Sequence, residues 1–191
     1  MAKRERILVY GEPGVGKTYT WLSIATRFPG STFYAIDTDD AVERNMEEFG
    51  DGDLPNVVLY QAMSWEDVER AVADIETRAQ PEDWVVVDMV DSLWSYVQAY
   101  FVEQVFHQAL DDYFLEVRKG LKSGATRLEA LKGWVDWAVI NKIYQDLINR
   151  LCYRVRSHLY LSAKAAAVSS SDDAEVVTTF SPYRFRPEGE K

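Results

Sequence analysis

Residues 6–18 read Arg-Ile-Leu-Val-Tyr-Gly-Glu-Pro-Gly-Val-Gly-Lys-Thr, and they are the strongest indication of the fold class in this sequence. The apolar run over 6–10 predicts a short strand, and a helix is expected from about 17 to 27. Between them lies the pattern Gly-x-x-x-x-Gly-Lys-Thr. Its glycines permit backbone conformations closed to other residues, so consecutive amides can turn inward around an anion at the positive end of the helix. Directly after a strand and opening a helix, this pattern predicts a phosphate-binding loop.

The loop pattern also assigns roles to individual side chains. Lys17 is expected to reach the β- and γ-phosphates of a nucleotide and so to take part in catalysis, and the Thr18 hydroxyl is expected to ligate Mg²⁺. No guanine-reading Asn-Lys-x-Asp motif is visible, which favours ATP. The alternative is a strand-to-helix turn that binds nothing. The expected nucleotide contacts are Gly11, Glu12, Pro13, Gly14, Val15, Gly16, Lys17, Thr18 and Tyr19.

Acidic residues follow two further predicted strands. Asp88 comes after Trp84 and three valines, and it is expected to hold magnesium together with Thr18. Asp37 and Asp39 follow the strand at 32–36 and should lie at the same edge of the sheet, because ligands bind at the carboxyl ends of parallel strands. We expect Asp39 to orient the attacking water; its alternative role is that of a helix cap ahead of residue 41.

Weaker candidates surround this site. Asp91 is a possible support for Asp88, and Ser92 is expected to cap the helix that follows. Ser162 and Lys164 end the predicted strand at 158–162. Lys164 is a candidate sensor of the γ-phosphate, or a cation that reaches the nucleotide of a neighbouring subunit, while the alternative for both residues is an ordinary solvated loop.

The rest of the chain alternates strands with helices, which predicts a single α/β domain over residues 1–191 with a mainly parallel sheet. A helical insertion is expected over about 92–134, in which one helix runs from 92 to about 119. Residues 176–180 are expected to be extended. Strands are predicted at 6–10, 32–36, 57–61, 84–87 and 158–162, and helices at 17–27, 41–49, 64–79, 92–119 and from 132 or 135 to 155.

Composition and charge limit the classes of protein to which this chain can belong. The net charge is −10, yet residues 118–156 hold nine basic and three acidic side chains, a pattern typical either of an anion-facing surface or of a solvated helix. The apolar run near the N-terminus is too short for a signal peptide or a membrane span. A single cysteine excludes an internal disulfide. These features predict a soluble cytoplasmic protein of a bacterium or of a phage-infected host.

Taken together, the motifs resemble the RecA-like class of P-loop NTPases, and in particular the short RecA-like single-strand annealing ATPases of phages (the Sak group). The matching segments are 11–18, Phe-Tyr-Ala-Ile-Asp-Thr-Asp at 33–39, Val-Val-Val-Asp-Met-Val-Asp-Ser at 85–92 and Leu-Ser-Ala-Lys at 161–164. The resemblance implies an ATPase that binds single-stranded DNA through 94–134 and 168–174 and that forms homo-oligomers. The water-activating glutamate of that family corresponds to Asp39, and its γ-phosphate sensor falls near Ser162.

Three functions follow from these observations. The first is a magnesium-dependent ATPase that acts on single-stranded DNA in recombination or annealing; aromatic and basic residues of the insertion would suit such a ligand. The helical spacing of those aromatic residues also fits a core or a subunit interface. The second is a slowly hydrolysing, nucleotide-switched module for protein partners. The third is a small-molecule kinase in which the basic window forms a lid.

Overall fold

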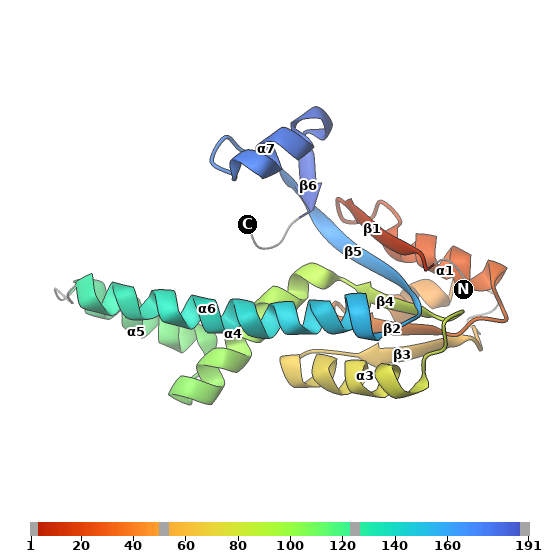
Figure 1. The fold of residues 1–191 in the computed structure, drawn as a ribbon, viewed down its shortest axis with the longest axis horizontal. Coiled ribbons are helices and arrows are strands. Elements are labelled where there is room, and N and C mark those ends of the chain that lie inside the picture. The colour runs from red at the N-terminus through yellow and green to blue at the C-terminus, as the bar shows by residue number, and fades with distance from the viewer. Residues whose placement is uncertain (1–3, 50–53, 123–126, 188–191) are drawn as a thin grey trace.

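The computed structural model describes residues 4–49, 54–122 and 127–187, and its centre is a parallel β-sheet (Figure 1). The strands are β1 (Arg6–Gly11), β2 (Phe33–Asp37), β3 (Val57–Gln61), β4 (Trp84–Asp88) and β5 (His158–Ala167). They are ordered β1-β5-β4-β2-β3. The five predicted strands are confirmed, although β5 continues five residues past its predicted end. The sequence Gly-Asp-Gly-Asp at 50–53 predicts a turn, and it lies outside the described residues.

Helices cover both faces of this sheet. On one face, α1 (Lys17–Arg27) and α2 (Val42–Met46) pack over a core that includes Trp21, Trp84 and Tyr160. On the other face, α3 (Trp65–Arg78) and α4 (Val90–Phe106) pack over Val85, Val87 and their neighbours. Side chains alternate between the faces along each strand, so Asp88, like Trp84 and Val86, faces α1. Ser64 caps α3 as expected, since its side chain accepts the amide of Asp67 at 3.2 Å.

A helical arm follows β4 and leads back to β5. It consists of α4, α5 (Leu110–Lys122), α6 (Arg127–Asn149) and a π-helical turn, η2 (Arg150–Arg154). Figure 1 shows α5 and α6 extending well beyond the sheet. The prediction of one helix from 92 to 119 is wrong, because His107 adopts a left-handed conformation (φ 54°) that ends α4. The sequence Lys-Gly-Leu-Lys-Ser-Gly at 119–124 predicts a break in the helix, but α5 continues through Lys122; residues 123 and 124 lie outside the described residues.

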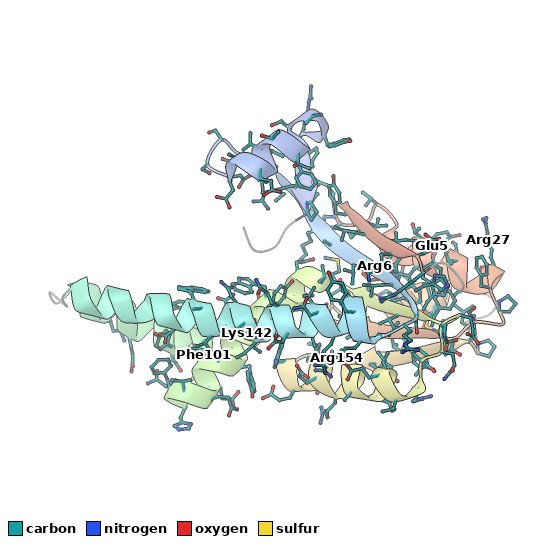
Figure 2. The ribbon with its side chains drawn as sticks, in the orientation of Figure 1. Glu5, Arg6, Arg27, Phe101, Lys142 and Arg154 are labelled. Atoms are coloured by element: carbon teal, nitrogen blue, oxygen red, sulfur yellow. The ribbon has the colours of Figure 1, made fainter. Side chains whose placement is uncertain are left out.

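Aromatic residues of the arm join its helices, since Phe106 of α4 packs on Tyr113 of α5 and Trp94 of α4 packs on two rings of α6. The Trp94 ring stacks on Trp137 with centroids 6.0 Å apart and meets Tyr144 edge-on at 5.4 Å. Phe101 is buried on α4, where Figure 2 labels it. The side chain of Trp134 lies outside the described part of the chain. Such ring pairs favour the core interpretation for these residues over free stacking platforms.

One arginine ties the arm to α3. The Arg150 guanidinium donates to both carboxylate oxygens of Glu76 at 3.0 Å and also contacts Glu69. Its side chain is only 18% exposed, so solvent screens this network less than a surface ion pair.

We therefore expect Arg150→Ala to lower the free energy of unfolding by about 1–2 kcal/mol, because two carboxylates lose a shared bidentate partner. The matched control is Lys142→Ala. Lys142 (labelled in Figure 2) pairs with Asp146 within α6, and both side chains are mostly exposed, so the expected change is below about 0.5 kcal/mol. Urea denaturation measures both variants; equal midpoints would contradict the structural role of Arg150.

The C-terminal part forms a small unit beside the carboxyl end of β1. It contains α7 (Ala174–Phe180), a short 3₁₀ turn η3 (Ser181–Tyr183) and β6 (Phe185–Pro187), which pairs antiparallel with Ala165–Ala167. The predicted extended conformation of 176–180 is wrong: the segment is helical, which brings Phe180 edge-on to the Tyr10 ring at 6.3 Å. β6 takes the strand position instead, and Arg186 on it pairs with the buried carboxylate of Asp172 at 3.0 Å.

Candidate nucleotide-binding site

The loop between β1 and α1 has the backbone geometry that a phosphate site needs. Gly14 and Gly16 have φ angles of 78° and 88°, values that side chains disfavour. α1 begins at Lys17, and no side chain caps its first amides. These amides and the positive end of the helix are therefore available to an anion. The loop is held against the sheet because the Tyr160 hydroxyl donates to the Lys17 carbonyl at 2.9 Å.

Lys17 lies over the loop rather than out in solvent. Its Nζ donates to the carbonyls of Gly11 at 2.9 Å and Glu12 at 3.0 Å, and the residue is only 7% exposed. An ammonium group buried in this position offers its charge and its third N–H to a ligand in the loop.

Most of the predicted contact residues meet in one cleft of about 250 Å³. Gly11 and Glu12 line a neighbouring cavity instead, and Val15 is exposed at the tip of the loop. Tyr19 lies in the cleft, where its ring packs on Phe49 at 4.6 Å. The cleft is lined by Pro13, Gly14, Gly16, Lys17, Thr18, Tyr19, Asp39, Ala41, Asn45, Met89 and Lys164.

Asp88 is buried at the carboxyl end of β4, as the sequence predicts. Its Oδ2 accepts the Thr18 hydroxyl at 2.7 Å and the Trp21 indole N–H at 2.9 Å, and its Oδ1 contacts the Ser162 hydroxyl. Within residues 4–49, 54–122 and 127–187, no basic side chain forms an ion pair with this carboxylate. An adjacent hydroxyl and a buried carboxylate without a cationic partner are a donor set that fits Mg²⁺. Sequence reasoning missed the role of Trp21, because nothing in the motif marks it.

The two acids after β2 have different roles. Asp37 is buried, and its Oδ2 accepts the amide of Val42 at 3.0 Å while its Oδ1 accepts the amides of Asp39 and Ala41 at 3.3 and 3.4 Å. Asp37 therefore organises the turn into α2. The capping role considered for Asp39 belongs to Asp37, and the carboxyl group of Asp39 lies in the nucleotide cleft instead.

The carboxyl group of Asp39 has unusual acid–base properties. Although part of the residue reaches solvent, partial burial of the group raises its pKa to about 6. The negative charges of Asp88 and Asp37 add to this effect, and the cation of Lys164 opposes it. A carboxyl group with a pKa near neutrality, placed in a phosphate cleft, is suited to accept a proton.

The weaker candidates are also located. Lys164 belongs to β5, opposite Gly11 in the β1 register, and it lines the cleft rather than a solvated loop. Asp91 does not support Asp88; it accepts the Lys164 amide at 3.1 Å and pairs with Lys164 Nζ at 3.5 Å. The expectation that Ser92 caps α4 is wrong, because the helix begins two residues earlier, after Met89.

A threonine that the sequence did not single out joins the strand ends. The Thr38 hydroxyl accepts the Met89 amide at 2.7 Å and donates to the Met89 carbonyl at 2.8 Å. Tyr96 on α4 in turn donates to the Thr38 carbonyl at 2.8 Å. These bonds fix the spacing between Asp39 and Asp88, two acids on different strands. No local pattern could have revealed them.

The parallel sheet and the glycine loop at its carboxyl edge define this chain as a nucleotide-binding protein of the P-loop class. A family model described as an AAA domain matches residues 3–182, and the chain belongs to that family. No curated protein matches it at a significant level. The family assignment supports nucleotide binding, and ATP binding in particular.

Two features are absent from the described part of the chain. None of the helices there combines the length and the apolar character needed to cross a membrane. In the same ranges, no group of three or more histidine, cysteine or acidic side chains is arranged to hold a metal ion. A magnesium ion at Thr18 and Asp88 would therefore take its remaining ligands from phosphate oxygens and water.

Proposed function

We propose that the protein hydrolyses ATP with the help of Mg²⁺. The observation that carries this proposal is the shared cleft: the carboxyl group of Asp39 lies in the same cavity as Lys17 and Thr18 of the phosphate loop. A site that only held nucleotide would need the loop alone, whereas hydrolysis also needs a group that orients or deprotonates water.

Each residue then has a defined task. Lys17 and the loop amides bind and orient the phosphates, and they stabilise the charge that develops on the γ-phosphate oxygens. Thr18 and Asp88 would hold Mg²⁺, which supplies neutralisation of phosphate charge when bound. Asp39 accepts the proton of the attacking water and orients it towards the phosphorus. Ser162, which contacts the Asp88 carboxylate, keeps that group in place.

The acid–base role of Asp39 predicts a pH dependence. A base works only as the carboxylate, so activity is lost as the pH falls through its pKa. Since that pKa is raised to about 6, kcat/KM should be level above pH 7 and fall about tenfold per pH unit below about pH 6. Steady-state ATPase assays between pH 5 and 8.5 test this profile. A level profile down to pH 5 would exclude Asp39 as the base.

We further propose that single-stranded DNA is the partner of this ATPase and that the chain acts on it as an oligomer. The resemblance to RecA-like annealing proteins supports the DNA partner. The exposed basic side chains of Lys119, Arg154 and Arg156 support it as well. Lys142 and Arg150 are already paired with acids, and the basic side chains at 118 and at 122–132 lie outside the described side chains. Because counterions are released when cations meet a DNA backbone, such binding weakens steeply as salt rises.

The test is ATP hydrolysis with Mg²⁺, measured with and without a single-stranded oligonucleotide. Each assay is run at about 50 and about 200 mM salt, because contacts between cations and DNA phosphates weaken strongly over that range. Stimulation by DNA at low salt that fades at high salt is the expected result. Binding of ATP with negligible turnover and no response to DNA would reject both proposals.

A second candidate is a nucleotide-switched module for protein partners. Its specific support is the apolar surface of the arm, where several large side chains are between 38% and 55% exposed. They are Val105, Phe106, Phe114, Leu115, Trp137 and Val139. They come from α4, α5 and α6, and a concentration of exposed apolar side chains in one part of a protein is typical of interaction surfaces. This candidate is favoured over the ATPase if nucleotide changes the association of the protein without being hydrolysed.

A further inference from the structure

A second cavity, of about 290 Å³, lies beside the phosphate loop and outside the nucleotide cleft. Three of its walls are aromatic rings from separate elements: Tyr10 of β1, Tyr183 of η3 and Phe185 of β6. The other described lining residues are Gly11, Glu12 and Ala165. Figure 1 shows the C-terminal unit standing over the end of β1, where these elements meet.

The chemistry of this lining points to a cation. Glu12 is the only charged residue in the described lining, and among the described residues no hydrogen bond or ion pair occupies its carboxylate. Tyr183 is 68% exposed and Phe185 41%, so ring faces are open to a ligand. Aromatic faces attract cations, and a carboxylate pairs with them. A planar guanidinium can satisfy both, because it stacks on a ring while its N–H groups reach an oxygen.

The same features argue against other ligands. The cavity is at the lower limit of the range in which drug-sized ligands bind, roughly 300–1,000 Å³, and so suits a side chain better than a nucleotide. A nucleic acid would bring phosphates towards the Glu12 carboxylate, which repels them.

Contacts within the C-terminal unit, and between it and the sheet, hold the elements that line this cavity in place. Arg186 on β6 pairs with the Asp172 carboxylate, which is fully buried, and the Val168 amide donates to the Arg184 carbonyl at 3.1 Å. Phe180 of α7 packs edge-on against Tyr10. These contacts hold the rings of η3 and β6 at a fixed place beside the loop.

We propose that this cavity is a docking pocket for an arginine side chain presented by a basic segment of a partner protein. The guanidinium stacks on Tyr183 and Phe185 and pairs with the Glu12 carboxylate. The pocket does not depend on nucleotide. However, the Lys17 ammonium donates to the carbonyls of Gly11 and Glu12, and both residues line the pocket. The pocket therefore adjoins the nucleotide cleft, but the two share no described lining residue.

The experiment is a titration of the ¹⁵N-labelled full chain with Nα-acetyl-arginine methylamide, followed by amide chemical shifts. We expect saturable shifts at Gly11 and Glu12 with a dissociation constant on the order of 1 mM. The neutral isostere Nα-acetyl-citrulline methylamide should bind at least about tenfold more weakly. Tyr183→Leu should weaken binding of the arginine probe about fivefold or more. Tyr153→Leu is the matched control, since that tyrosine is 71% exposed but lies on η2, away from the pocket, and it should change nothing.

Several results would overturn the proposal. Equal shifts with the citrulline probe would show that the pocket does not distinguish a charged side chain from a neutral one. Unchanged binding of the arginine probe in Tyr183→Leu would show that the probe binds elsewhere. Shifts at these amides with a thymidine oligonucleotide but not with arginine would make the pocket a nucleobase site. Self-association of the chain that is lost in Tyr183→Leu would assign the pocket to a second copy rather than a different partner. Lys17→Ala separates the two hypotheses: ATP binding is lost there while the arginine probe still binds.

Discussion

Lys17→Ala is expected to weaken ATP binding at least about 100-fold and to reduce hydrolysis to background. The lysine is the only basic residue of the loop, and its Nζ already lies within hydrogen-bonding reach of two loop carbonyls. A bound phosphate would gain charge-assisted hydrogen bonds from it, each worth about 1.5–3 kcal/mol, and each 1.4 kcal/mol is a factor of ten. Fluorescence titration with an ATP analogue measures the affinity, and a phosphate-release assay measures the turnover.

The controls for this variant are structural. Its circular dichroism spectrum should match that of the parent protein, because the alanine still occupies the first turn of α1 and the Tyr160 hydroxyl still reaches the backbone carbonyl of residue 17. Lys142→Ala, on the arm, should bind ATP normally. Unchanged affinity in Lys17→Ala would mean that nucleotide does not use this loop.

Asp39→Asn is expected to have a different effect: ATP binding is retained while kcat falls by about 100- to 10,000-fold. The amide keeps the shape of the side chain but cannot accept a proton from water, and general base catalysis contributes rate factors of that size. Removing a negative charge from the phosphate cleft should leave affinity equal or somewhat higher. The loss should therefore fall on kcat and not on KM, which single-turnover and steady-state assays distinguish.

A neighbouring acid provides the matched control. Asp40 has a left-handed backbone (φ 55°) that asparagine tolerates, and its carboxylate accepts from the Gln61 side chain outside the nucleotide cleft. Asp40→Asn should therefore hydrolyse ATP at close to the parent rate. If both variants lose activity equally, the turn after β2 acts as a whole and Asp39 has no special role.

The parts of the fold that depend on local signals were predictable. The glycine loop, the valine strand that ends in Asp88 and the Ser64 cap each rest on residues adjacent in sequence. Their side chains decide the backbone conformation within one or two turns. The same holds for the phosphate cleft, because the carboxyl ends of parallel strands share one edge of a sheet.

The parts that depend on distant contacts were not predictable. Residues 163 and 164 continue β5 because β1 pairs with them, and residues 165–167 continue it further because they pair with β6, which is distant in sequence from the other strands. The helix at 174–180 presents Phe180 to Tyr10, and nothing near it in the sequence indicates this contact. Asp37 rather than Asp39 binds the amides of the turn into α2, a choice made by the geometry of two adjacent strands.

The position of β5 between β1 and β4 matters for the nascent chain. In the described sheet β1 hydrogen-bonds to β5 alone. Arg6, at the start of β1, therefore gains its strand partner only when Leu159 of β5 has been made. While the ribosome extends the chain, β2, β3 and β4 can already pair with one another, but β1, which is made before them, cannot join them until β5 is present. Contacts of such large sequence separation form late and slowly. ATP therefore cannot assist the early steps of folding, because its binding site is completed only after β5 has been made.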